Sequence, residues 1–139
     1  MSALKLTDVK AGQEIPALMK RVTMRQLVMW AGASGDYNPI HYDSKFAASR
    51  GLSNVVAHGQ LITSFLCQML SDWYGDAGCL KKLDVSYKGF NYPSDTLICR
   101  GLIKEVFPCE CSVALEIWVE NQRNEKTVSG RAVIQFAGA

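Results

Sequence analysis

The strongest hydrophobic pattern in the chain lies between residues 59 and 73. Apolar side chains recur there at intervals of three and four residues, which is the period of an α-helix with one broad apolar face. As far as Ser71, the opposite face carries only small or uncharged side chains. We therefore expect a helix that the rest of the protein encloses. Its apolar positions are Leu61, Ile62, Phe65, Leu66, Met69, Leu70 and Trp73.

The surrounding window, residues 51–71, contains no Asp, Glu, Lys or Arg and is about as long as a membrane span. Polar side chains interrupt it, and unpaired polar groups are costly in lipid. We therefore expect a helix buried in protein and no association with a membrane. The polar residues are Ser53, Asn54, His58, Gln60, Thr63, Ser64 and Gln68.

Four later segments alternate apolar and polar residues, which is the pattern of β-strands with one buried face. A polar hairpin loop at 121–126 separates the last two, and Pro93-Ser94-Asp95 marks a turn. Four consecutive strands after one buried helix predict an α+β domain, an antiparallel sheet curled around the helix, spanning residues 1–139. The alternating segments are 83–88, 99–104, 111–120 and 128–136.

The first half of the chain predicts shorter elements. An apolar N-terminal arm ends at Ile15-Pro16. Thr23-Met24-Arg25-Gln26 has the form of a capping box and predicts a helix that ends between Gly32 and Gly35. Asp43 is placed to cap a second, short helix, with Gly51 just beyond its end.

Composition narrows the class of protein. With 48% apolar and 20% charged residues, the chain is typical of a soluble globular protein. The net charge of +2 is small and scattered, so no nucleic acid is expected as a partner. The first residues lack the apolar core of a secretion signal, and we expect a cytoplasmic protein.

Five cysteines form no Cys-x-x-Cys pair, which favours reduced thiols and no metal site. Cys109 and Cys111 stand two apart in a strand-like run, so both are expected on one face. The other three are Cys67, Cys79 and Cys99.

The candidate chemistry begins at Asp36-Tyr37-Asn38-Pro39-Ile40-His41. Proline stiffens this loop, so the Asp36 carboxylate and the His41 imidazole are held near one another and could share a water molecule in proton transfer. The same residues also suit an ordinary polar turn. Asp36 and His41 together with Asp43 could instead bind a metal.

A second cluster surrounds the start of the long helix. Free N–H groups at Gly59 suit a developing oxyanion, although Gly59 could equally be only a flexible helix start. The neighbouring His58 is more often structural than catalytic. Ser64 could reach the same cavity or bond to the carbonyl of Gln60, and Asn38 is expected to brace the loop.

Taken together, the segments 30–43, 46–47, 51–52 and 56–61 closely resemble the hydratase-2 motif of the MaoC-like family. This family comprises (R)-specific enoyl-CoA hydratases and (3R)-hydroxyacyl-ACP dehydratases. The resemblance implies a hot-dog fold, with Asp36 and His41 as catalytic pair and Gly59 in the oxyanion hole. It also implies that Asn38 orients the loop and that the hydroxyl of Ser64 lies near the site.

The resemblance further implies reversible hydration of trans-2-enoyl thioesters to (3R)-3-hydroxyacyl thioesters. No cofactor is implied beyond the CoA or the ACP phosphopantetheine that the substrate carries. The partner is an acyl-CoA or acyl-ACP, and the assembly is a homodimer, with sheets joined edge to edge, or a hetero-oligomer with a homologue. Acyl chain, carrier and physiological direction stay open.

The chain departs from the family pattern at three positions. Trp30 stands where many members have Tyr, Ser94 replaces the usual Gly of a turn, and Ser86 stands where some members have a basic residue. Two alternatives on the same fold are a non-catalytic acyl-binding subunit and a thioesterase. A thioesterase would want a carboxylate on the buried helix, where the first acid after Gly59 is the distant Asp72.

Overall fold

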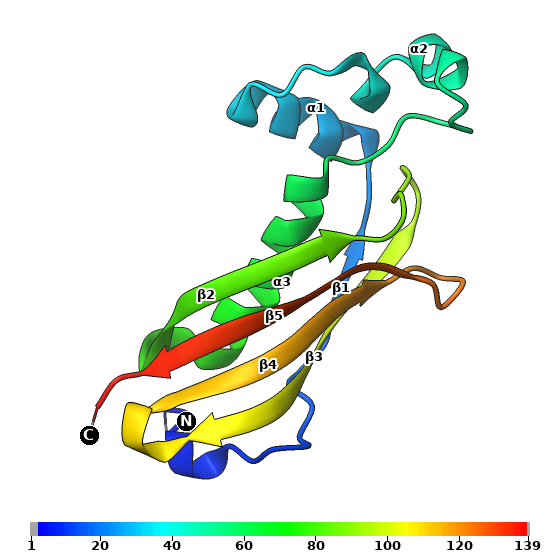
Figure 1. Cartoon of the computed structure of the whole chain (residues 1–139). Helices are drawn as coiled ribbons and strands as arrows, with labels where there is room; N and C mark the ends of the chain where they lie inside the picture. Colours follow the sequence, from blue (N-terminus) through cyan, green and yellow to red (C-terminus); the bar gives the residue numbers. More distant parts are fainter. Residues whose placement is uncertain (1–2, 139) are drawn as a thin grey trace.

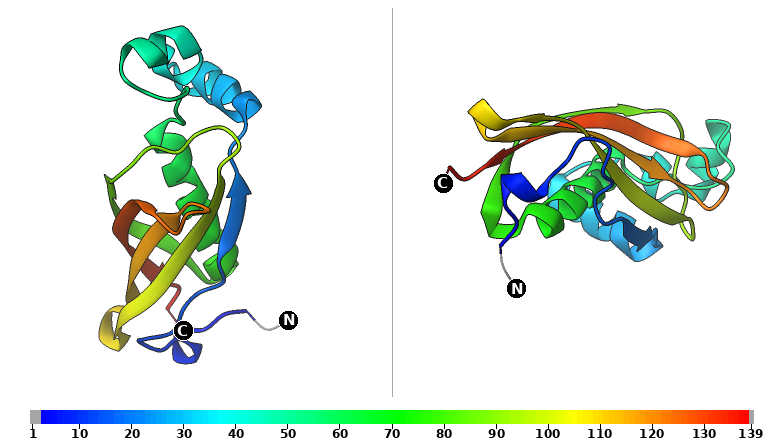
Figure 2. Two further views of the ribbon diagram at one scale, coloured as in Figure 1. Left: turned by 90° about the vertical axis from the view of Figure 1, so that its right-hand side faces the viewer. Right: turned by 90° about the horizontal axis from the view of Figure 1, so that it is seen from below.

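The computed structural model describes residues 3–138 and contains one strongly curled antiparallel sheet (Figure 1). The strands lie in the order β1-β3-β4-β5-β2, and every neighbouring pair is antiparallel. The concave face of the sheet holds the long helix α3, Gly59–Tyr74 (Figure 2). The strands are β1 Leu18–Arg21, β2 Gly78–Tyr87, β3 Thr96–Phe107, β4 Ser112–Glu120 and β5 Lys126–Phe136.

Helix α3 forms where the 59–73 pattern predicts it. Six of its seven predicted apolar side chains are buried, and the seventh, Trp73, packs edge-on against Phe136 with ring centroids 6.0 Å apart. The helix and the inner face of the sheet thus make one apolar core, as predicted.

The four predicted strands are confirmed, and all but β4 extend beyond the predicted segments. The sheet also contains β1, which the sequence did not predict, because its four residues are too few to show a period. The prediction for Cys109 and Cys111 is wrong: Cys109 lies in a 3-10 turn, and Cys111 has a φ of 49° before β4 begins. All five cysteines are free.

Side-chain caps define the two helices of the first half. In the capping box of α1, Met24–Ser34, the N–H of Gln26 donates to Thr23 Oγ1 at 3.2 Å, and the N–H of Thr23 donates to Gln26 Oε1 at 3.0 Å. Asp43 Oδ1 accepts the first N–H groups of α2, Ser44–Ser49. Both predicted caps are therefore confirmed.

Helices α1 and α2 and their connections project beyond one end of the sheet (Figure 1). We call residues 24–57 the overhang, and α3 with the five strands the core. The chain passes from the overhang into the core at His58 and Gly59, where α3 begins. Within residues 3–138, no helix combines the length and the apolar character needed to cross a membrane.

Candidate active site

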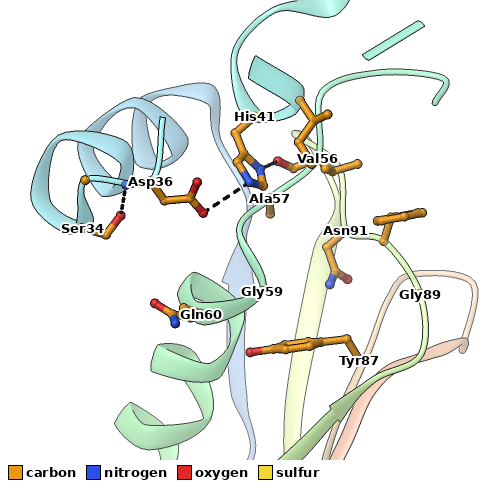
Figure 3. Close-up of a pocket in the computed structure, with 13 residues that line it drawn as sticks. Ser34, Asp36, His41, Val56, Ala57, Gly59, Gln60, Tyr87, Gly89 and Asn91 are labelled. Carbon is orange, nitrogen blue, oxygen red and sulfur yellow. Dashed lines mark hydrogen bonds and ion pairs between the residues drawn. The ribbon is translucent and has the colours of Figure 1, made fainter. Parts of the chain in front are cut away.

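The loop before His41 is built from short-range hydrogen bonds. Asp36 Oδ1 accepts the N–H of Asn38 at 3.2 Å, and Asn38 Oδ1 accepts the N–H of Ile40 at 3.3 Å. Pro39–His41 then form a 3-10 turn. These bonds leave the second carboxylate oxygen of Asp36 facing His41, with Oδ2 and Nε2 3.6 Å apart (Figure 3). The structure thus brings the two sequence-predicted residues together and places Asn38 in the brace between them.

The ring of His41 is fixed from its other side. Its Nδ1 lies 2.7 Å from the carbonyl oxygen of Val56, and a carbonyl can only accept, so Nδ1 carries the hydrogen. In the neutral ring, Nε2 then presents a lone pair toward the Asp36 carboxylate. The 3.6 Å separation is too long for a direct hydrogen bond. A water molecule between them could donate one hydrogen to each acceptor.

His58 supports both members of this pair. Its ring stacks on the His41 ring, with centroids 3.7 Å apart and planes inclined by 19°, and its Nε2 donates to the backbone carbonyl of Asp36 at 3.1 Å. The remaining Nδ1 is buried, and no residue between 3 and 138 hydrogen-bonds it. Burial lowers the pKa of His58, against the opposing effect of the bond to Asp36. His58 thus packs against the ring of His41 and, through its Nε2–H, holds the backbone of Asp36.

The polar atoms of Asp36, His41 and His58 lie within 4.8 Å of one another, a composition that can hold a metal ion. The geometry of the rings opposes this use. A metal must lie in the plane of each ligating ring at about 2.0–2.1 Å, whereas two stacked rings inclined by only 19° share no such point. Asp43, considered above as a third ligand, instead caps α2.

Gly59 is the first residue of α3, and within the described residues no side chain caps this helix. Its first N–H groups are therefore available to a ligand. The packing also explains why the residue is glycine: a Cβ here would lie 2.8 Å from Cζ of Tyr87. The hydroxyl of Tyr87 is hydrogen-bonded to that of Thr63 at 2.9 Å, which fixes the ring.

One cavity of about 650 Å³ joins these groups (Figure 3). Asp36, His41 and Gly59 all line it. Aromatic, aliphatic and small side chains make up most of the rest of its wall, and Gln60 and Asn91 add polar amides. The other lining residues are Ser34, Gly35, Ile40, Val56, Ala57, Gln60, Tyr87, Gly89, Phe90 and Asn91.

Two residues have positions in the structure that the sequence does not predict. Ser64 does not line this cavity, and its hydroxyl donates to the carbonyl of Leu61 at 2.6 Å rather than to that of Gln60. Asn91, by contrast, lines the cavity and was not singled out. An asparagine two residues before a turn carries no signal of its own, so only the fold reveals its position.

The sequence relatives include enoyl thioester enzymes. The (R)-specific enoyl-CoA hydratase of Rhodospirillum rubrum is 25% identical over 124 residues, covering 83% of this chain and 85% of that protein. The fatty acid synthase subunit beta of Gibberella zeae is 36% identical over 69 residues, covering 48% of this chain. The chain spans only 3% of that subunit and 5% of its Aspergillus oryzae counterpart.

Solved structures show the same architecture. R-hydratase PhaJ1 from Pseudomonas aeruginosa superposes with a TM-score of 0.90 at 22% identity, covering 99% of this chain and 88% of that one. The (R)-hydratase of A. caviae gives a TM-score of 0.87 at 23% identity, covering 93% and 98%. These likenesses confirm the predicted hot-dog fold. The family model for the MaoC like domain matches residues 8–110, and the chain therefore belongs to the MaoC-like family.

Proposed function

We propose that this protein catalyses the reversible hydration of trans-2-enoyl thioesters to (3R)-3-hydroxyacyl thioesters. One observation carries the proposal: the Asp36 carboxylate and Nε2 of His41 face each other at 3.6 Å in a cavity that Gly59 also lines. The hydratases among the relatives of this chain support the same reaction. The acyl group is carried by CoA or by ACP phosphopantetheine, and no other cofactor takes part.

In the hydration direction, a water held by Asp36 and His41 presents its oxygen to the β-carbon of the substrate. As the carbon–oxygen bond forms, one water proton passes to the pair. A proton from His41, or through the pair, is delivered to the α-carbon on the same face, so that OH and H are added overall. Such acid–base groups typically contribute about 10²–10⁴ in rate.

Negative charge develops on the thioester oxygen during this step. The N–H of Gly59, at the positive end of the α3 dipole, is placed to donate to that oxygen. A single donor of this kind contributes about 10²–10³ in rate. The overhang thus supplies proton transfer, and the core supplies the oxyanion donor.

The proposed assembly is a homodimer with sheets joined edge to edge, or a hetero-oligomer with a homologue. One structural neighbour, with a TM-score of 0.83, is the ChsH1-ChsH2 complex from Mycobacterium tuberculosis. In the second arrangement this chain could act as a non-catalytic acyl-binding subunit. The presence of both Asp36 and His41 in one cavity favours the catalytic role.

The thioesterase alternative is disfavoured by the position of its only candidate acid. Asp72 lies near the C-terminal end of α3 and lines a different, smaller cavity with Pro16, Ala17, Leu18, Met69 and Trp73. It is therefore removed from the N-terminus of the helix, where the Gly59 N–H would hold a thioester oxygen.

The direct test follows the loss of enoyl-thioester absorbance with short, medium and bulky trans-2-enoyl groups, each on CoA and on a carrier protein. We expect turnover with at least one acyl class and a product of R configuration. Absence of hydration with every substrate, or a product of S configuration, would contradict the proposal. A thioesterase would instead release free thiol, which a thiol reagent detects in the same samples.

A further inference from the structure

Asn91 carries a polar group that folding leaves without a partner. The residue is only 4% exposed, and within residues 3–138 its Oδ1 is buried and accepts no hydrogen bond. A buried polar atom in this state costs folding free energy, because the water it bound in the unfolded chain is not replaced. Such a group calls for a specific explanation in a native protein.

The side chain of Asn91 faces the cavity of the candidate active site. Figure 3 shows its amide below Ala57, beside Gly59 and above the ring of Tyr87. All four residues line the same cavity as Asp36 and His41. The Asn91 amide therefore borders the place where the proposed substrate would bind, but its Oδ1 is itself covered, so the side chain must turn for a ligand to reach it.

The backbone around Asn91 is fixed on both sides. Its carbonyl accepts the N–H of Ala57 at 2.8 Å, two residues before Gly59. The N–H of the next residue, Tyr92, donates to Asp95 Oδ2 at 2.8 Å, and Asp95 is itself held by Gln122. The backbone that carries the Asn91 amide is thus fixed before any ligand arrives, which lowers the entropic cost of recognition.

We propose that Asn91 is a substrate-recognition residue that accepts a hydrogen bond from an amide N–H or a hydroxyl group of the acyl thioester. This inference rests on the proposed function. It adds to that function a chemical group that the substrate must carry. An apolar acyl chain bound to a small thiol would leave Oδ1 unpaired. A pantetheine arm offers amide N–H groups close to the thioester, and a hydroxylated acyl chain offers the alternative source.

The test compares wild type with Asn91→Leu, which keeps the shape of the side chain and removes both polar atoms. Three substrates separate the sources of the hydrogen bond: trans-2-butenoyl-CoA, the S-ethyl thioester of trans-2-butenoic acid, and the S-ethyl thioester of a hydroxylated trans-2-enoic acid. We expect kcat/KM to fall about 10-fold or more for a substrate that bonds Oδ1. The plain S-ethyl thioester should change by less than about 2-fold, because it has no donor to lose.

If kcat/KM falls only for the CoA substrate, the pantetheine amide is the donor to Asn91. If it falls only for the hydroxylated substrate, the hydroxyl of the acyl chain is the donor. Equal rates for wild type and Asn91→Leu on both polar substrates would overturn the proposal. So would an equal loss on all three substrates, because that result describes a structural role.

Thr127→Val provides a matched control. Thr127 is 2% exposed, and its hydroxyl is also buried without a partner among the described residues, but it does not line the cavity. Both substitutions remove an unpaired polar atom at nearly constant shape, so neither should lower Tm. Only Asn91→Leu should change the kinetics, and a lower Tm for Asn91→Leu would show that its amide is paired in the fold.

Calorimetric titration distinguishes a failure of the recognition role of Asn91 from a failure of the proposed hydration reaction. If wild type hydrates none of the three thioesters, their saturated analogues are titrated into wild type and Asn91→Leu. Weaker binding of a donor-carrying analogue to the variant, by the same factor of about 10, supports the recognition role without catalysis. Unchanged Kd for every analogue contradicts it.

Discussion

The core and the overhang are stabilised in different ways. In the core, α3 and the inner face of the sheet bury large apolar side chains completely, among them Leu66, Leu70, Leu115 and Ile117. In the overhang, Leu27 is also fully buried, but several large apolar side chains remain exposed, and caps and short backbone bonds hold the ends of its short helices. The exposed residues are Met24, Val28, Met29, Tyr37 and Tyr42.

The candidate site lies where these two regions meet. The overhang contributes Asp36 and His41, and the core contributes Gly59 and the aromatic ring of Tyr87. Two hydrogen bonds lie at this junction: His58, just before α3, donates to the Asp36 carbonyl, and the N–H of Ala57 donates to the carbonyl of Asn91, between β2 and β3. Most of the large buried side chains therefore lie in the core and the proposed proton-transfer pair lies in the overhang, and the junction sets the position of that pair relative to Gly59.

The largest expected effects follow from removing the acid–base pair in the overhang. Asp36→Asn and His41→Gln should each lower kcat/KM about 10²–10⁴-fold, because the substituted groups cannot exchange a proton with water. The fold should persist, since the core is unchanged. Steady-state hydration kinetics and thermal unfolding by circular dichroism check both parts, and near wild-type turnover in both variants would remove the assignment.

For the free energy of unfolding, substitutions in the core should have a larger effect than substitutions in the overhang. Leu66→Ala, at a fully buried position of α3, is expected to cost about 2–5 kcal/mol of unfolding free energy. Val28→Ala, at a 58% exposed position of the overhang, should change it by less than about 0.5 kcal/mol. Urea unfolding measures both. Equal losses would show that the overhang shares the stability of the core.

His58→Phe tests the junction itself. Phenylalanine keeps an aromatic ring against His41 but cannot donate to the Asp36 carbonyl. We expect kcat to fall about 10-fold with little change in KM, because small misplacement of reacting groups is costly. His58→Gln retains a donor and should recover part of the loss. If His58→Phe and His58→Gln have the same kcat, the hydrogen bond from residue 58 to the Asp36 carbonyl does not position Asp36 and His41.

The same residue predicts a pH dependence of stability. The pKa of His58 is lowered in the folded state by burial, so below about 6.5 the unfolded chain binds a proton that the folded chain resists. The contribution of His58 is therefore fully present above that pH and is lost progressively as the pH falls toward the lower, folded pKa. Urea unfolding between pH 8 and 5 should show this decline in wild type and a shallower one in His58→Phe.

A small gain in stability is expected from the turn before β3. Ser94 has a φ of 76°, a left-handed conformation that costs a non-glycine residue about 1–2 kcal/mol. Ser94→Gly relieves this strain but adds about 0.4–1 kcal/mol of unfolded-state entropy. A net gain of about 0.5–1 kcal/mol in unfolding free energy, with unchanged kinetics, is expected. Loss of stability would mean that the Ser94 side chain stabilises the turn.

Much of the core could be predicted because its signals are local. The apolar face of α3 and the strand alternation each predict an element within a few residues, and the two caps do the same for α1 and α2 in the overhang. Strand β1 could not, because only its pairing with β3, Leu18 opposite Cys99, makes it a strand. A segment of four residues is too short for its sequence to indicate that it will pair with a strand far along the chain.

In the candidate site, too, the sequence predicts the local features but not the contacts between distant residues. Asp36 and His41 are five residues apart in a proline loop, so their proximity could be read from the chain. The stacking of His58 on His41 and the position of Asn91 depend on contacts between residues distant in sequence. The direction of the Ser64 hydroxyl was left open, because a serine near a helix start can bond to several carbonyls.

The central claim is that Asp36 and His41 act as one unit held over the start of α3. The most direct measurement compares the double variant Asp36→Asn/His41→Gln with both single variants in the enoyl-thioester hydration assay. We expect the double variant to lose about as much activity as the worse single variant, because the two groups share one proton-transfer step. Independent, multiplying losses, or hydration retained in the double variant, would contradict it.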